Sequence, residues 1–102
     1  MKEYDIFVPL YYNDGTPVEA KKFQSLQKWI LDRFVGMTAF PQPNKGAWKM
    51  GNVIFQDEVV IYRVLTPKSK KIRRMFLNLK EKLKIAFRQE EILIVERNVR
   101  VI

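Results

Sequence analysis

Stretches of alternating hydrophobic and polar residues, separated by two stretches with helical spacing, define the elements that the chain predicts. Residues 4–12 and 58–65 alternate and are rich in β-branched and aromatic side chains, so each predicts a strand. Residues 91–102 predict a last long strand with a bulge near Asn98. Strands are therefore expected at the start of the chain, past its middle and at its end.

Two segments carry hydrophobic residues every three or four positions, which is the spacing of a helix that packs one side against a core. The first helix is expected over about residues 18–34, with Pro17 at its start and Gly36 as its C-terminal cap. The second is expected to start at Pro67. The buried sides are formed by Phe23, Leu26, Ile30 and Phe34 in the first helix and by Ile72, Phe76, Leu79, Leu83 and Phe87 in the second.

Residues 37–57 give a less regular pattern. Residues 38–40 predict a short strand, and residues 41–44, with two prolines, predict a loop. Residues 47–49 and 53–55 predict the two arms of a hairpin that turns at the glycine between them.

The predicted order is strand, helix, two strands, helix, strand. It is typical of an α+β fold, the ferredoxin-like βαββαβ sandwich, in which two helices cover one face of an antiparallel sheet. An extra hairpin around residues 47–55 is compatible with this arrangement. A chain of 102 residues is expected to form a single domain over residues 1–102.

The predicted sheet is apolar on both faces. The first strand has Ile6 and Val8 on one side and Phe7 and Tyr11 on the other. Two helices can cover only one face, and monomers seldom expose so large an apolar surface. We therefore expect a second copy of the chain to cover the other face and form a homodimer. A single-stranded nucleic acid that stacks on Phe7, Tyr11 and Tyr62 is the alternative.

The net charge of +8 resides in one segment, from Lys68 to Arg88, which contains nine basic residues and the single acid Glu81. The rest of the chain has ten basic and ten acidic residues. A solvated helix usually mixes both signs, so this segment predicts an anionic partner, either nucleic acid or an acidic protein. Membrane binding is not expected, because the apolar side of this helix is needed for the core.

A helical wheel gives the candidate binding residues of this segment. Leu77 and Ile85 are included because they are apolar but point away from the buried side, as a partner-binding residue would. A simply solvated helix face is the alternative interpretation. The candidates are Lys70, Lys71, Arg73, Arg74, Leu77, Lys80, Lys84, Ile85 and Arg88.

Missing residue types narrow the catalytic chemistry. The chain has no cysteine and no histidine, which excludes thiolate nucleophiles, imidazole bases and the usual zinc sites. Its four glycines stand singly, so no phosphate-binding loop is predicted. No catalytic residue, metal site or cofactor is assigned, and an enzyme is less expected than a binding protein.

A pocket beside the middle loop is the main candidate if the chain is nevertheless an enzyme. Asp57 and Glu58 stand where a hairpin arm enters a strand, and carboxylates can serve in acid–base chemistry. Trp48 and Tyr11 could stack on a ligand there, although Trp48 could equally close one end of the core.

No apolar run reaches the length that crosses a bilayer, and the first five residues include three charges. We therefore expect a cytoplasmic protein.

Two segments of the sequence carry a resemblance to a known protein family. Residues 40–66 (FPQPNKGAWKMGNVIFQDEVVIYRVLT) and residues 8–15 (VPLYYNDG) resemble a family of small bacterial ferredoxin-like proteins of about 100 residues. That family has no assigned activity, so the resemblance implies a fold and no site. The order of elements also resembles the dimeric ferredoxin-like nucleases of CRISPR adaptation, which hold a metal at an aspartate ending the first strand. Asp14 lies beyond that strand, so the metal site is not carried over.

Three hypotheses of function follow. The first is a non-enzymatic homodimeric binding module whose helix at residues 68–88 binds nucleic acid or an acidic protein. The second is a small dimeric enzyme that uses carboxylates and aromatic residues near residues 41–58. The third is a subunit of a larger complex that binds its partner through Leu77 and Ile85.

Overall fold

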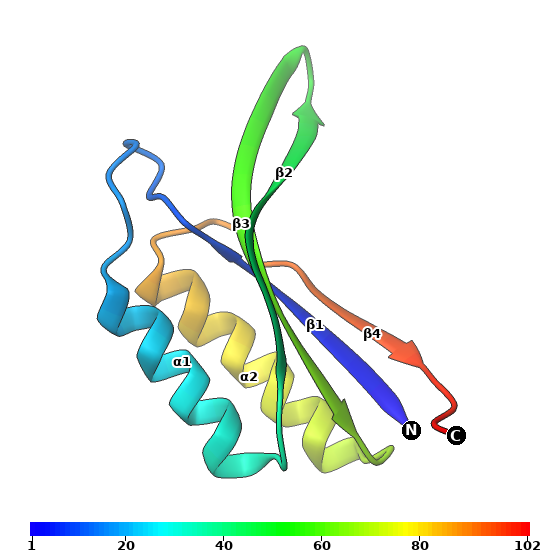
Figure 1. Cartoon of the computed structure of the whole chain (residues 1–102). Helices are drawn as coiled ribbons and strands as arrows, with labels where there is room; N and C mark the ends of the chain where they lie inside the picture. The colour runs from blue at the N-terminus through cyan, green and yellow to red at the C-terminus, as the bar shows by residue number, and fades with distance from the viewer.

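The computed structural model describes residues 1–102 as four antiparallel strands and two helices (Figure 1). The elements are β1 (Lys2–Pro9), α1 (Ala20–Arg33), β2 (Thr38–Met50), β3 (Val53–Thr66), α2 (Lys70–Ala86) and β4 (Ile94–Asn98). The strands lie in the order β2-β3-β1-β4, and both helices cover the same face of the sheet. This arrangement confirms the ferredoxin-like α+β fold predicted from the sequence.

The core lies between the helices and one face of the sheet. Alternation along β1 directs Tyr4, Ile6 and Val8 toward the helices, where they are almost fully buried. The predicted apolar sides of both helices meet them, with Ile30 from α1 and Phe76 from α2 among the most buried residues. The ring of Phe76 stacks on Tyr4 at 4.0 Å between centroids, which joins α2 to the central strand.

Both helices begin later than the sequence predicts. Pro17 pairs with Tyr11 in an isolated β-bridge, so α1 starts only at Ala20. At the second helix, the side chain of Ser69 accepts a hydrogen bond from the backbone N–H of Ile72 and caps α2. The predicted C-terminal cap at Gly36 is also wrong, because α1 ends at Arg33 and the capping residue is Phe34, in an extended conformation.

The hairpin of β2 and β3 is one long ribbon. The prediction of a loop at residues 41–44 is wrong, since β2 runs through this segment with a register shift between Phe40 and Asn44. Prolines are tolerated there because β2 is an edge strand, whose outer backbone groups have no partner strand. The predicted extra hairpin is therefore the far end of the same ribbon, which turns at Gly51 with a φ of +62°.

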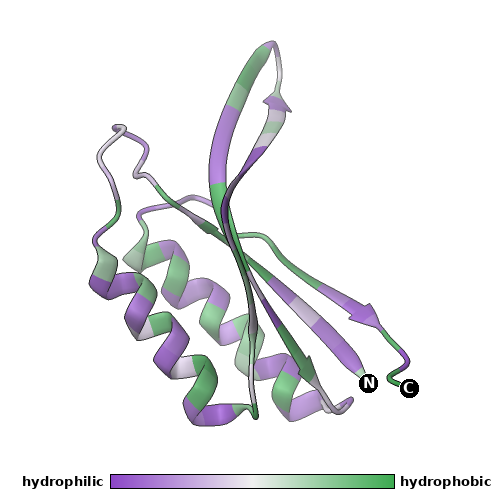
Figure 2. Cartoon of the chain, in the orientation of Figure 1, coloured by the Kyte–Doolittle hydropathy of each residue, from purple (hydrophilic) through white to green (hydrophobic).

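The far end of this hairpin projects from the rest of the molecule (Figure 1). The pairing of β1 with β3 ends at Pro9 and Val59, so residues 45–57 have neither a third strand nor a helix beside them. We call residues 45–57 the arm. Figure 2 shows hydrophobic colour at the tip of β3 in this arm, well away from the helices.

The sheet face opposite the helices has no covering element. It carries half-buried apolar side chains from the two central strands, including Phe7, Val59 and Ile61. Tyr62, which the sequence analysis placed with the stacking residues, faces the helices instead, is 4% exposed and accepts a hydrogen bond from Gln27. We call this uncovered side the open face.

Neither helix combines the length and hydrophobicity that a membrane-crossing segment requires.

Candidate functional site

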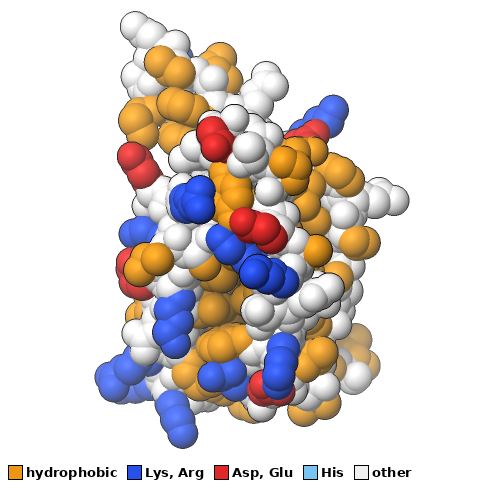
Figure 3. All heavy atoms as spheres, turned by 90° about the vertical axis from the view of Figure 1, so that its left-hand side faces the viewer, with side chains coloured by type: hydrophobic (Ala, Val, Ile, Leu, Met, Phe, Trp, Pro, Cys, Tyr) orange, Lys and Arg blue, Asp and Glu red, His pale blue; other side chains and the backbone are white.

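The arm exposes large hydrophobic side chains that nothing in the chain covers. Trp48 is 46% exposed and Phe55 is 40% exposed, and Met50, Val53 and Ile54 are more exposed still. Figure 3 shows hydrophobic side chains gathered at this projecting end of the molecule. Exposed aromatic residues of this size, clustered on one element, commonly mark a binding surface.

Trp48 and Phe55 are cross-strand partners and form the centre of this surface. Their rings stack with centroids 4.4 Å apart and planes 16° apart. The indole Nε1 of Trp48 donates a hydrogen bond of 2.8 Å to the Oδ2 of Asp57, which fixes the orientation of the indole. The outer faces of the two rings remain accessible next to a carboxylate. We call Trp48, Phe55 and Asp57 the arm cluster.

The other two residues of the predicted pocket lie differently. Glu58 follows Asp57 in β3, so alternation directs its side chain to the opposite face of the ribbon. Tyr11 is 44% exposed and lies near the base of the arm, since the N–H of the preceding residue, Leu10, donates to the carbonyl of Glu58. The structure thus joins Trp48 to Asp57 by a hydrogen bond and forms no hydrogen bond or ion pair between these two residues and Tyr11 or Glu58.

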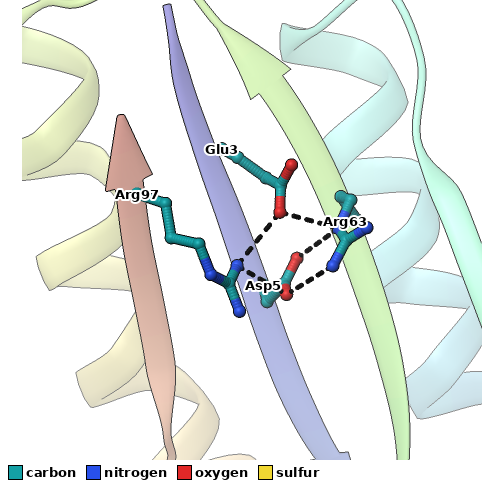
Figure 4. A network of polar contacts seen from close by, with 4 residues as sticks. All are labelled: Glu3, Asp5, Arg63 and Arg97. Carbon is teal, nitrogen blue, oxygen red and sulfur yellow. Dashed lines mark hydrogen bonds and ion pairs between the residues drawn. The ribbon is translucent and has the colours of Figure 1, made fainter. Parts of the chain in front are cut away.

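A second polar site lies on the open face, at the other end of β3. Glu3 and Asp5 of β1 are flanked by Arg63 of β3 and Arg97 of β4 (Figure 4). Arg63 donates to both oxygens of Asp5, at 2.9 and 3.0 Å, while the Nη1 of Arg97 donates to Asp5 at 2.9 Å and to Glu3 at 3.0 Å. We call these four residues the charge network.

The carboxylates lie beneath the guanidinium groups. The side chains of Asp5 and Glu3 are 3% and 15% exposed, against 36% for Arg63 and 44% for Arg97. The two hydrogen bonds from Arg63, and then the one from Arg97, hold the pKa of Asp5 below its usual value despite its burial. The bond to Asp5 in turn raises the pKa of Arg63, so this pair stays charged at neutral pH. The guanidinium of Arg63 also lies over the ring of Phe40, at 5.0 Å.

The sequence analysis missed a third group, at the start of α1. The hydroxyl of Tyr12 donates to Glu19 and accepts from Lys22, whose Nζ also donates to the carbonyl of Ala86 at 2.6 Å. The pKa of Glu19 is lowered to about 2, first by the bond from Tyr12. The spacing of Glu19 and Lys22, one helical turn apart, was the available signal. Because Lys22 of α1 donates to the carbonyl of Ala86, this group ties α1 to the end of α2.

The predicted basic surface of α2 is partly neutralised by acids from other elements. Lys80 pairs with Glu91 at 3.0 Å, and Arg73 pairs with Glu96 of β4 at 3.4 Å. Within the helix, Lys84 pairs with Glu81 at 3.4 Å. The guanidinium of Arg88 lies 4.7 Å from the ring of Tyr12. The remaining candidate residues, Lys70, Lys71, Arg74, Leu77 and Ile85, are exposed.

No group of three or more acidic side chains lies close enough together to hold a metal ion.

Comparison with known proteins gives one structural finding. No protein-family model and no curated protein matches the chain, so the resemblance to a bacterial ferredoxin-like family stays a prediction. The fold is similar to that of a phage SAM lyase in complex with S-methyl-5′-thioadenosine, with a TM-score of 0.66 and 17% sequence identity. The match covers 94% of this chain and 79% of the lyase chain.

This finding contradicts the expectation of a non-enzymatic binding module with a basic helix. A protein that shares the fold over nearly the whole chain is an enzyme with a nucleoside bound. The ion pairs of Lys80 with Glu91 and of Arg73 with Glu96 give the physical reason for the error, because counting charges along α2 overlooked acids that the fold brings beside it. The comparison agrees better with the second hypothesis, a small enzyme, than with the first, a non-enzymatic binding module.

Proposed function

We propose that the chain is a small homodimeric enzyme that acts on an adenine nucleoside carrying sulfur at its 5′ carbon, as S-adenosylmethionine does. The observation that carries the proposal is the arm cluster, two stacked exposed aromatic rings beside a carboxylate. The similarity of the whole fold to an enzyme that binds S-methyl-5′-thioadenosine supports this choice of ligand.

The arm cluster offers what a nucleoside needs. A purine base stacks on an exposed indole or phenyl ring, and such stacking is worth about 1–3 kcal/mol per base. The carboxylate of Asp57 accepts hydrogen bonds only, so it can take the hydroxyl groups of a ribose. The hydrogen bond from Trp48 fixes the position of this carboxylate relative to the indole ring on which the base would stack.

The proposed substrate also suits a chain without histidine or cysteine. In a sulfonium the sulfur already carries a positive charge, so when a carbon–sulfur bond breaks the electron pair stays on sulfur and a neutral thioether leaves. The carbon that it leaves forms a new bond to an oxygen nucleophile, such as water or a carboxylate, or loses the proton next to it to form a double bond. That leaving group needs no proton from a general acid. Aromatic faces and carboxylates, which this chain has, are the groups that attract a cation of this kind.

A second copy of the chain is proposed to cover the open face. Phe7, Val59 and Ile61 lie in its middle, and Phe40, Leu65 and Leu93 around them are between 38% and 54% exposed. A two-fold axis through this face would pack each apolar surface on its own copy, which is the commonest way that identical chains associate.

Ligand binding tests the proposed site. Titration with S-methyl-5′-thioadenosine in a Trp29→Phe background, where Trp48 is the remaining tryptophan, is expected to change the tryptophan fluorescence. By calorimetry, Trp48→Ala should weaken binding about tenfold or more, because the base loses its stacking partner. Trp48→Phe keeps an aromatic ring and should bind within a few-fold of the parent protein. Release of S-methyl-5′-thioadenosine from S-adenosylmethionine, followed by chromatography, tests the activity.

The control for the ligand test is Val53→Ala, which changes the tip of the arm without touching the ring pair or Asp57 and should leave binding unchanged. Absence of binding at millimolar nucleoside, or equal binding by Trp48→Ala and the parent protein, would refute the assignment of the site.

Light scattering tests the homodimer. The chain of 12.2 kDa is expected to show about twice this mass at micromolar concentration. Ile61→Lys places a charge in the middle of the open face and should yield monomers, whereas Leu77→Lys, on the exposed side of α2, should not. A parent protein that is monomeric at these concentrations would contradict the proposal.

A further inference from the structure

A groove with an apolar floor lies between α1 and α2. Its volume is about 350 Å³, which is within the range of small-molecule sites. The floor consists of Leu26, Leu79, Leu83 and Phe87, none of which is more than 5% exposed. Because the helices cover one face of the sheet, the groove lies on the side of the molecule opposite the open face. It therefore stays accessible when a second copy of the chain covers the open face.

The rim of the groove carries positive charge that no acid of the chain neutralises. Lys21 of α1 and Lys82 of α2 are exposed, line the groove from its two walls and form no ion pair. The acids nearest to them in the sequence, Glu19 and Glu81, pair with other lysines at 3.5 and 3.4 Å. Figure 3 shows hydrophobic side chains between Lys and Arg side chains on this side of the molecule. Two unpaired ammonium groups above an apolar floor are complementary to a ligand with an anionic head and an apolar body.

The two ends of the groove differ. The start of α1 lies beside the end of α2, where the Nζ of Lys22 donates to the carbonyl of Ala86, so positive charge gathers at this end. Trp29 lines the other end, eight residues of helix from Lys21, which is about 12 Å. The indole is half-buried and the guanidinium of Arg33 lies over its ring at 4.3 Å, so it is a poor stacking surface for a flat base. A flexible alkyl chain needs only the apolar floor.

We propose that the groove between the helices binds the anion of a medium-chain fatty acid. Its carboxylate lies on Lys21 and Lys82, and its alkyl chain follows the floor toward Trp29. The groove contains no residue of the arm cluster, so this assignment goes beyond the proposed function and is tested independently of it.

Titration with decanoate, below the concentration at which it forms micelles, tests the apolar part of the site. In a Trp48→Phe background, where Trp29 is the remaining tryptophan, the emission should shift to shorter wavelength as the alkyl chain covers the indole. By calorimetry, octanoate should bind about fourfold or more weakly than decanoate, because it buries two fewer methylene groups.

The charged part of the site is tested with an amphiphile of opposite sign. Decyltrimethylammonium carries an alkyl chain of the same length and should bind about tenfold or more weakly than decanoate. The double variant Lys21→Gln, Lys82→Gln should weaken decanoate binding by a similar factor. Lys70→Gln, Lys71→Gln removes the same charge from exposed positions at the other end of α2 and is the matched control, which should bind as the parent protein does.

Ser25→Phe tests the groove without a change of charge. Ser25 is exposed and lies in the wall of the groove, one helical turn after Lys21, so a phenyl ring there should cover the floor. The variant should lose the difference between octanoate and decanoate and should unfold in urea as the parent protein does.

Absence of binding at millimolar decanoate would overturn the assignment, as would equal binding of decanoate and decyltrimethylammonium. Unchanged affinity in the Lys21→Gln, Lys82→Gln variant would do the same. Decanoate binding that disappears in Trp48→Ala, but not in the lysine variant, would place the alkyl chain on the exposed arm and would also overturn it.

Discussion

Phe76→Ala is expected to lower the free energy of unfolding by about 4 kcal/mol. The ring is 3% exposed and stacks between Tyr4 at 4.0 Å and Phe34 at 5.4 Å, with the edge of Trp29 at 6.2 Å. Alanine would leave a cavity where α1, α2 and β1 meet, so burial, aromatic contacts and packing are lost together. Domains of this size are stable by roughly 5–15 kcal/mol, so the variant should lose between about a quarter and four fifths of the parent protein's stability. Urea unfolding followed by circular dichroism measures the difference.

Leu77→Ala is the matched control for Phe76→Ala. Leu77 follows Phe76 in α2 but is 52% exposed, so its replacement should change the free energy of unfolding by no more than about 0.5 kcal/mol. A loss below about 1 kcal/mol for Phe76→Ala would mean that the aromatic cluster does not join the helices to the sheet.

Arg63→Ala is expected to cost about 2–3 kcal/mol at pH 7, because it removes two of the three hydrogen bonds to the buried carboxylate of Asp5. The value is below that of a fully buried pair because Arg63 itself is 36% exposed. The pKa of Asp5 is lowered in the folded protein, so its contribution to stability is present above the unfolded pKa of about 4 and is lost as the pH falls further. The difference between the parent protein and the variant should therefore shrink from pH 4 toward pH 2, as urea unfolding across this range would show.

The double variant Asp5→Leu, Arg63→Leu is the control for this electrostatic account. It removes both charges together, so it should be more stable than Arg63→Ala, which leaves Asp5 buried with less compensation. An equal loss of stability for Arg63→Ala at pH 3 and pH 7 would show that packing of the arginine, and not its charge, is responsible.

Local patterns predicted the layers of this fold well, because helices and central strands bury hydrophobic side chains that recur at a fixed spacing along the chain. The apolar sides of both helices and the outward positions of Leu77 and Ile85 lie as their spacing predicts. The prediction of a loop at residues 41–44 failed because Pro41 and Pro43 are typical of a loop, although this segment belongs to β2. Only the position of β2 at the sheet edge, which depends on the tertiary fold, makes prolines compatible with a strand.

The candidate sites depend on contacts between residues that lie far apart in the sequence, and local patterns do not predict such contacts. Asp5 and Arg63 are 58 positions apart in the chain, and Arg97 is farther still, so their network appears only once β1 is paired with both neighbours. The sequence predicts Trp48 and Asp57 as candidates, yet for Phe55, which stacks on Trp48, it predicts only a place in the hairpin. The register of the hairpin decides which of these side chains meet.

The edge position of β2 also limits how copies of the chain can add to one another. A long bare strand edge invites a foreign strand to extend the sheet, which is a route to fibrils. Here Pro41 and Pro43 remove two backbone donors from that edge, the bulge between Phe40 and Asn44 breaks its repeat, and Lys45 and Lys49 place positive charge along the arm. Edge-to-edge growth is thereby discouraged, and the hydrophobic tip can stay exposed at cellular concentrations without seeding an open-ended aggregate.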